Sequence, residues 1–194
     1  MTTIVGIAGS LRRGSYNTAL LRAAVELAPS GSTVKPASIR AIPLYDGDLE
    51  AESGVPDAVR ELKALIAGAD GLLLVTPEYN NSIPGVLKNA IDWLSRPAAD
   101  IPRVFGGRPV ALMGATPGRG GTTLSQTAWL PVLRALGTRP WFGRTVYVAG
   151  ASKVFDDGGN LIDEQVRAQV GSFMAGFAEF VERSRSTGTG QRTS

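Results

Sequence analysis

The stretch GLLLVTP, residues 71–77, is a short, unbroken apolar run that ends at a proline. Runs of this kind are typical of a strand that is buried on both faces of a parallel sheet. Three further segments have the same β-rich apolar character: TIVGIAG at 3–9, RPVALMGAT at 108–116 and RTVYVAG at 144–150. A weaker fifth segment, STVKPASI at 32–39, contains Pro36, which favours the edge of a sheet.

Segments with helical spacing of apolar residues separate these predicted strands. They are Asn17–Ala28, Asp57–Ala67, Pro84–Ser95, Thr122–Gly137, which Pro131 is expected to kink, and Asp163–Arg183. Residues 42–56 are predicted to form a loop, and the polar residues 184–194 a disordered tail. We therefore expect one domain over residues 1–183.

The alternation of strands and helices with short connections predicts a five-stranded parallel sheet with helices on both faces. Two α/β folds compete. The flavodoxin-like three-layer sandwich, with strand order 2-1-3-4-5, needs five strands in one domain. The six-stranded dinucleotide-binding fold needs another strand and a glycine fingerprint, and the sequence offers neither. The flavodoxin-like order is therefore the expected one.

The amino-acid composition excludes several classes of catalytic site. The chain has 194 residues, 43% hydrophobic and 19% charged, with no histidine and no cysteine. A Ser-His-Asp triad and a thiolate nucleophile are excluded, and the commonest soft-metal ligands are missing. We therefore expect no catalytic side chain and no metal site, with the chemistry carried by a bound cofactor.

The charge and the hydrophobic pattern limit the classes of binding partner and the cellular location that we expect. The net charge is +3, and Arg183, Arg185 and Arg192 at the C-terminal end account for three of the positive charges. No basic-aromatic stripe or basic helical face is present, so we expect no nucleic-acid partner. No apolar run reaches the roughly 18 residues that span a bilayer. The N-terminus is predicted to be a strand rather than a signal peptide. These features favour the cytoplasm and no membrane partner.

Three loops at the carboxyl ends of the predicted strands carry the unusual residues, and in such sheets ligands bind at this edge. The first loop, Gly9–Tyr16, leads into a helix whose N-terminus favours an anion. Ser10, Ser15 and Asn17 offer neutral donors and Arg12 a charged one, a set that suits a phosphate monoester. The alternative is that Ser15 or Asn17 caps the helix while the arginines face water.

In the second loop, residues 77–83, Pro77 and Pro84 bracket EYNNSI and restrict its backbone. A stiff loop can hold backbone amides against a flat ring, which Tyr79 could cover. Glu78 could instead face solvent. The third loop, GATPGRGG at 114–121, has four glycines, which permit close approach of the backbone to a ligand.

Four motifs together resemble the NADPH-dependent FMN reductase family of flavodoxin-like flavoproteins, which includes bacterial quinone, chromate and azo reductases. They are GSLRRGSYN at 9–17, PEYNNSIPGVLKNAIDWLSR at 77–96, TPGRGG at 116–121 and KVFDDGGNLIDE at 153–164. The resemblance runs from about Thr2 to Arg183. It implies that FMN is bound, and that NADPH or NADH is the co-substrate.

The resemblance also implies a set of cofactor-binding residues. Ser10, Arg12, Ser15 and Asn17, with intervening amides, would hold the FMN phosphate, and Tyr16 is a further cofactor-binding residue of this loop. The isoalloxazine would be lined by Pro77, Glu78, Tyr79 and Asn80, and its other side would be closed by Thr116, Pro117 and Gly118. The first loop is suited to one terminal phosphate, so we expect FMN to bind and FAD not to bind comparably. Arg119 departs from the family pattern and could meet an NADPH phosphate or point to water.

By the same resemblance, NAD(P)H would reduce FMN, and a small acceptor would then take the electrons: a quinone, an azo dye, chromate or free flavin. A homodimer or homotetramer is expected, with Trp93, Trp129 and Trp141 as candidate interface residues. The main alternative is a flavodoxin-type electron carrier that does not oxidise NAD(P)H. Such carriers are typically strongly acidic, and this chain is not. A second alternative is a non-flavin nucleotide-binding or structural protein on the same fold.

Overall fold

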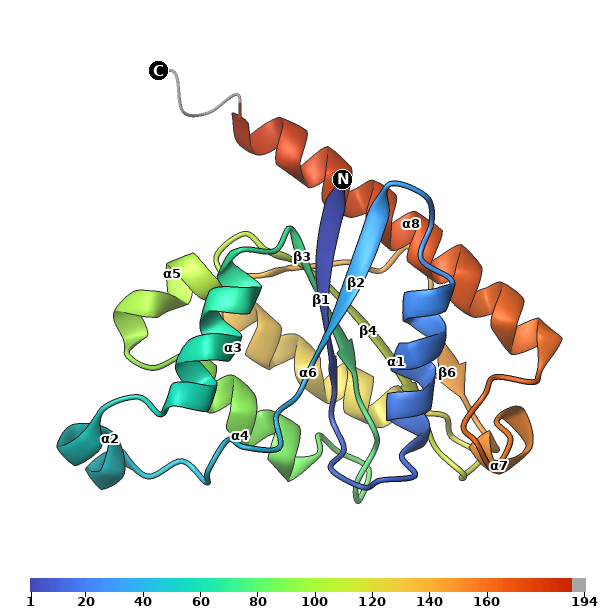
Figure 1. The fold of residues 1–194 in the computed structure, drawn as a ribbon, viewed down its shortest axis with the longest axis horizontal. Coiled ribbons are helices and arrows are strands. Elements are labelled where there is room, and N and C mark those ends of the chain that lie inside the picture. Colours follow the sequence, from blue (N-terminus) through green and yellow to red (C-terminus); the bar gives the residue numbers. More distant parts are fainter. Residues whose placement is uncertain (190–194) are drawn as a thin grey trace.

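A parallel sheet of order β2-β1-β3-β4-β5 forms the middle layer of the molecule, as the sequence predicts (Figure 1). The computed structural model describes residues 1–189. The strands of this order are β1 (Thr2–Ala8), β2 (Ser32–Ala37), β3 (Gly71–Val75), β4 (Pro109–Ala115) and β5 (Arg139–Pro140). A further short strand, β6 (Tyr147–Val148), also pairs with β4.

Two helical layers cover the sheet, and their cores explain the apolar run at 71–75. One layer contains α1 (Tyr16–Glu26) and α8 (Glu164–Thr189), and the other contains α3 (Asp57–Ala67), α4 (Gly85–Leu94) and α6 (Thr123–Ala135). Leu73 and Val75 of β3 belong to the first core, whereas Leu72 and Leu74 belong to the second. Because side chains alternate along a strand, a strand covered on both faces is apolar at every position.

The sheet differs from the prediction mainly at the expected fifth strand, residues 144–150. Only Tyr147–Val148 pairs with β4 there, and Arg139–Pro140, which the sequence did not predict, pairs with the earlier part of β4. The N–H of Trp141 and the carbonyl of Val146 still bond to Val110 and Gly114 of β4, at 2.8 and 3.2 Å, so the pairing is interrupted over residues 142–145. Trp141 packs its ring against Phe173 and Phe177 of α8, at centroid distances of 5.0 and 5.7 Å. Packing of this large, half-buried side chain on α8 competes with a continuous edge strand.

Short helices also occur where none was predicted: α2 (Gly47–Ser53), η1 (Ala98–Asp100), α5 (Ile101–Val104) and α7 (Ala151–Val154). The first lies inside the predicted loop 42–56, at the edge of the molecule in Figure 1. Asp46 caps its start, because the Asp46 side chain accepts the N–H of Asp48 at 2.9 Å, and the helix buries no residue. A helix without a buried face has no apolar periodicity, so the sequence pattern could not indicate it.

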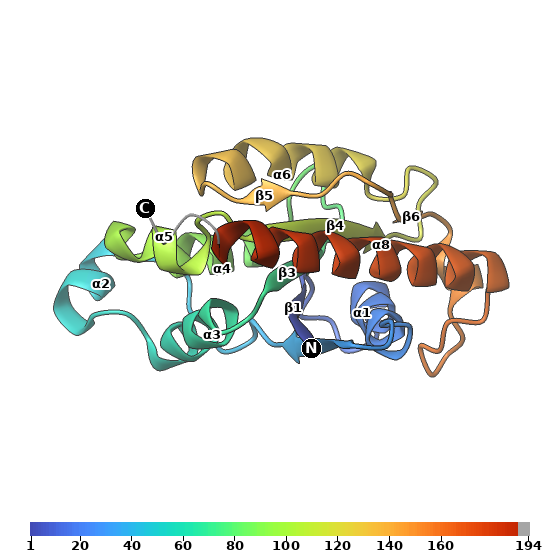
Figure 2. The same ribbon diagram turned by 90° about the horizontal axis from the view of Figure 1, so that it is seen from above.

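The last helix ends six residues later than expected, at Thr189 instead of Arg183. The first part of the predicted tail is therefore helical, and Arg185 reaches back to the carbonyl of Met1 at 3.3 Å and to Asp70 at 3.4 Å. Residues 190–194 lie outside the described residues. Figure 2 shows α8 running along the length of the molecule. Within residues 1–189, no helix is long and apolar enough to cross a membrane.

Candidate functional site

One cavity of about 500 Å³ lies at the carboxyl ends of β1, β3 and β4. Its volume is within the usual range for a small-molecule site. Three loops that are far apart in the sequence form it. The lining residues are Ser10, Arg12, Ser15, Tyr16, Asn17, Pro77, Glu78, Tyr79, Ala115, Thr116 and Pro117. The structure thus brings together every predicted site residue except Asn80 and Gly118, and it adds Ala115.

The start of α1 forms one end of this cavity. The hydroxyl of Ser15 caps the helix by accepting the N–H groups of Asn17 and Thr18, at 3.2 and 3.3 Å. The capping interpretation of Ser15 is therefore confirmed. Among the described residues, the N–H groups of Gly14 and Tyr16 have no hydrogen-bond partner. Free N–H groups and the positive end of the helix dipole favour an anion at this position.

Arg12 and Asn17 play different parts at this end of the cavity. The guanidinium of Arg12 lies over the ring of Tyr16, 5.3 Å from its centroid, so the charge is held at the cavity wall. Asn17 is buried, and its side chain bonds to the backbone of Ala115: its Nδ2 donates to the carbonyl at 2.8 Å and its Oδ1 accepts the N–H at 2.9 Å. Asn17 thus fastens the start of α1 to the end of β4.

The second loop is shaped by a tight turn. The backbones of Tyr79 and Ser82 bond to each other in both directions, at 3.2 and 3.0 Å. Asn80 and Asn81 between them have φ values of 50° and 60°. Positive φ at both central residues is the mark of a type I′ turn, which asparagine tolerates better than most residues. The turn leaves Asn80 outside the cavity lining, and the hydroxyl of Tyr79 donates to Ser10 of the first loop at 3.3 Å.

Glu78 does not simply face solvent. Its Oε2 accepts the N–H groups of Leu124 and Ser125, at 2.9 and 3.0 Å, and so caps α6. Thr122, the residue that precedes this helix, makes no side-chain cap of its own. A carboxylate at a helix N-terminus is stabilised by the helix dipole. Glu78 thereby ties the second loop to α6.

Buried hydrogen bonds behind the second loop add to its stiffness. Thr76 is fully buried, and its hydroxyl donates to the carbonyl of Pro77 at 3.0 Å. The indole N–H of Trp129 donates to the same hydroxyl at 3.1 Å. The first loop also approaches closely, because a Cβ on Gly9 would lie 2.7 Å from Leu87 and 3.0 Å from Pro77. These contacts fix the backbone on which a flat ring would rest.

The third loop is held by hydrogen bonds to β6 and to the residue that precedes α7. The N–H of Thr116 donates to the carbonyl of Val148 at 2.9 Å, and the carbonyl of Gly118 accepts the N–H of Gly150 at 3.0 Å. This second bond uses the backbone of Gly118 away from the cavity. Arg119 is not among the lining residues of the cavity.

Comparisons with known proteins agree with this geometry. Residues 2–169 match the NADPH-dependent FMN reductase family. The chain belongs to that family. It is therefore an NAD(P)H-dependent oxidoreductase with FMN as its cofactor, as the loop motifs indicated.

Individual relatives cover nearly the whole chain. An NAD(P)H-dependent FMN reductase of Pseudomonas aeruginosa is 42% identical over 94% of this chain and 96% of its own length. A 2-hydroxy-1,4-benzoquinone reductase of a Burkholderia species is 40% identical, over 94% and 97%. Among solved structures, the NAD(P)H:acceptor oxidoreductase FerB of Paracoccus denitrificans superposes with a TM-score of 0.84 at 32% identity, over 95% of this chain and 99% of that one.

Two of the three tryptophans that the sequence suggested for a subunit interface lie in the core instead. Trp93 and Trp129 are fully buried within the chain itself, and the indole N–H of Trp93 donates to the carbonyl of Pro43 at 3.0 Å. They are core residues and are not available to a second subunit. Trp141 packs mainly on α8, as described above.

Proposed function

We propose that FMN occupies the cavity between the three loops, with its phosphate at the start of α1 and its ring between the second and third loops. The observation that carries this proposal is the convergence of the predicted residues on one cavity, with free N–H groups at one end of it. Arg12 supplies the positive charge at that end. The two stiffened loops supply flat backbone walls at the other.

The residues of the chain bind and orient the cofactor and do no acid or base chemistry of their own. Bound FMN supplies the redox chemistry, taking two electrons from NAD(P)H and passing them to an acceptor. The turn at Tyr79–Ser82 and the cap by Glu78 hold the second loop in place. Preorganised backbone donors of this kind can stabilise negative charge that develops on a bound ring.

We further propose a quinone as the acceptor, because one relative is a benzoquinone reductase at 40% identity. The flavodoxin-type carrier is disfavoured, since the net charge is +3 and the chain belongs to a family of reductases. We also propose that the protein works in the cytoplasm, where NAD(P)H is supplied. Its proposed oligomeric state is a homodimer or homotetramer.

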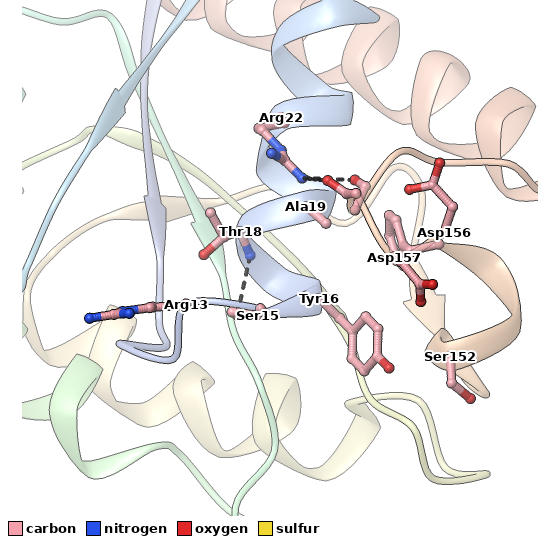
Figure 3. Close-up of a pocket in the computed structure, with 13 residues that line it drawn as sticks. Arg13, Ser15, Tyr16, Thr18, Ala19, Arg22, Ser152, Asp156 and Asp157 are labelled. Carbon is pink, nitrogen blue, oxygen red and sulfur yellow. Dashed lines mark hydrogen bonds between the residues drawn. The ribbon is translucent and has the colours of Figure 1, made fainter.

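The phosphate site is tested by the affinity of the flavin-free protein for FMN. Arg12→Ala should weaken binding about 10- to 150-fold, because a hydrogen bond to a charged group contributes roughly 1.5–3 kcal/mol. Arg13→Ala is the matched control: the neighbouring side chain extends away from the α1 helix start (Figure 3), and FMN affinity should change by less than about twofold. Equal effects of the two substitutions on calorimetric affinity would place the phosphate elsewhere.

The acceptor is tested by turnover of the FMN-loaded protein. With NADPH or NADH as the donor, a benzoquinone should be reduced at least about tenfold faster than free FMN or an azo dye. The NAD(P)H-dependent loss of flavin absorbance should occur without any acceptor. A protein whose bound flavin stays oxidised under NAD(P)H would be a carrier instead of a reductase.

A further inference from the structure

A second pocket, of about 380 Å³, adjoins the flavin cavity at the start of α1. It lies between the first two turns of α1 and the loop that follows α7 (Figure 3). Ser15 and Tyr16 line both the pocket and the cavity. The two spaces therefore meet where the proposed phosphate of FMN would lie.

One wall of this pocket is preformed by hydrogen bonds between α1 and the loop. The guanidinium of Arg22 donates to the carbonyls of Gly158 and Gly159, at 3.0 and 2.9 Å. Asp156 accepts the backbone N–H and the side-chain N–H of Asn160, at 2.7 and 2.8 Å. These donors hold the pKa of Asp156 below its usual value, the side chain of Asn160 contributing most. Asp156 is thus ionised and already satisfied.

The opposite wall presents an apolar surface and a free acceptor. The ring of Tyr16 is stacked on Phe155, with centroids 6.0 Å apart and planes 25° apart, so its position is fixed. Ala19, one turn further along α1, is also among the lining residues. Asp157 makes no hydrogen bond or ion pair among the described residues, and its carboxylate lies on the Tyr16 side of the loop (Figure 3).

We propose that this pocket accepts the adenosine monophosphate half of FAD, so that the chain binds FAD as well as FMN. The proposal rests on the proposed function, because it takes the FMN phosphate at the start of α1 as its point of departure. A second phosphate joined to the first continues past Ser15 and Tyr16 into the pocket. The adenine then lies against Tyr16 and Ala19, and its amino group donates to Asp157.

Size and charge agree with this ligand. Pockets of about 300–1,000 Å³ are usual for small-molecule ligands, and this one is lined by both apolar and polar groups. The positive charge of Arg22 in the wall offsets the carboxylates beside the phosphates. The expectation from sequence that FAD does not bind comparably to FMN rested on the first loop alone. The space beyond that loop is formed by residues more than 130 positions later in the chain.

The test is calorimetric titration of the flavin-free full-length protein with FMN and with FAD. The wild type should bind FAD within about tenfold of its affinity for FMN. Asp157→Trp fills the pocket without touching the flavin cavity, so it should weaken FAD at least tenfold and change FMN by less than twofold. Asp48→Trp is the matched control, because Asp48 is exposed on α2, and it should alter neither affinity by more than twofold.

The outcomes separate this inference from the function on which it rests. If FMN itself does not bind, the proposed function fails. If FMN binds but FAD is more than tenfold weaker, the FAD proposal alone is overturned. It is equally overturned if Asp157→Trp changes both affinities alike or changes neither.

Discussion

Glu78 illustrates how one side chain at the site acts through the backbone. The sequence left open whether it faces water, and the structure shows that its carboxylate joins the second loop to the start of α6. It lines the cavity, yet its hydrogen bonds go to N–H groups of the protein. We therefore assign it a positioning role.

Two substitutions at Glu78 distinguish this role from direct participation in the reaction. Glu78→Gln keeps an acceptor oxygen, so the rate of flavin reduction by NAD(P)H should fall by less than about tenfold, or roughly 1.4 kcal/mol of barrier. Glu78→Ala removes the cap and should lower the free energy of unfolding by about 0.5–2 kcal/mol. Stopped-flow absorbance and chemical denaturation measure the two effects. A rate loss above a hundredfold in Glu78→Gln, with stability unchanged, would show that the carboxylate takes part in the chemistry.

At the scale of secondary structure, the site depends on how α1 and β4 are joined. The two hydrogen bonds between Asn17 and Ala115 are buried, and they link positions 98 residues apart. They set the distance between the first and third loops, and hence the width of the cavity. The amide of asparagine suits this task because it donates and accepts at once.

Asn17→Ala should therefore be costly. It leaves a buried N–H and a buried C=O of Ala115 without partners, and each such loss costs about 1–3 kcal/mol. We expect the free energy of unfolding to fall by at least about 2 kcal/mol, with FMN affinity reduced as well. Thr18→Ala is the control, because Thr18 is the next residue of α1 and is exposed. It should change the free energy of unfolding by less than about 0.5 kcal/mol. Urea denaturation of the flavin-free protein measures both effects. A similar loss of unfolding free energy in the two variants would contradict the role given to Asn17.

At the scale of the whole molecule, the pH dependence of stability follows from composition and ion pairs together. The chain has no histidine and no cysteine, so it has no side chain that ordinarily titrates between pH 5 and 8. Several carboxyl groups, by contrast, have lowered pKa values. The pKa of Asp100 is lowered chiefly by its hydrogen bond from the buried Lys63, and that of Glu50 by its hydrogen bond from Arg96.

A carboxyl group with a lowered pKa in the folded state binds a proton more readily when the chain is unfolded. Its contribution is therefore complete above the unfolded pKa, near 4, and is lost as the pH falls through the folded value. We expect the free energy of unfolding of the flavin-free protein to be nearly constant from pH 8 to 5 and to fall below about pH 4. Denaturant titrations at unit steps of pH measure this. A large loss of stability between pH 7 and 5 would contradict the assignment.

Local patterns in the sequence were sufficient for the layers, the strand order and the three loops of the site. Unbroken apolar runs such as 71–75 and helical spacing such as 57–67 depend on which faces are buried, and burial leaves its mark on neighbouring positions. The loop motifs could be located because parallel strands bring their carboxyl ends to one edge. The expected cavity residues followed from this rule and from the family resemblance.

Contacts between distant residues were decided only by the tertiary structure. The split edge strand depends on Trp141 meeting α8, and the cap by Glu78 depends on where α6 begins. The link between Asn17 and Ala115 and the pocket beside Tyr16 likewise join segments that are far apart in the chain. Hydrogen-bond partners and cavities arise where separate elements meet, and a single sequence records the residue type at each position but not the neighbour that completes it.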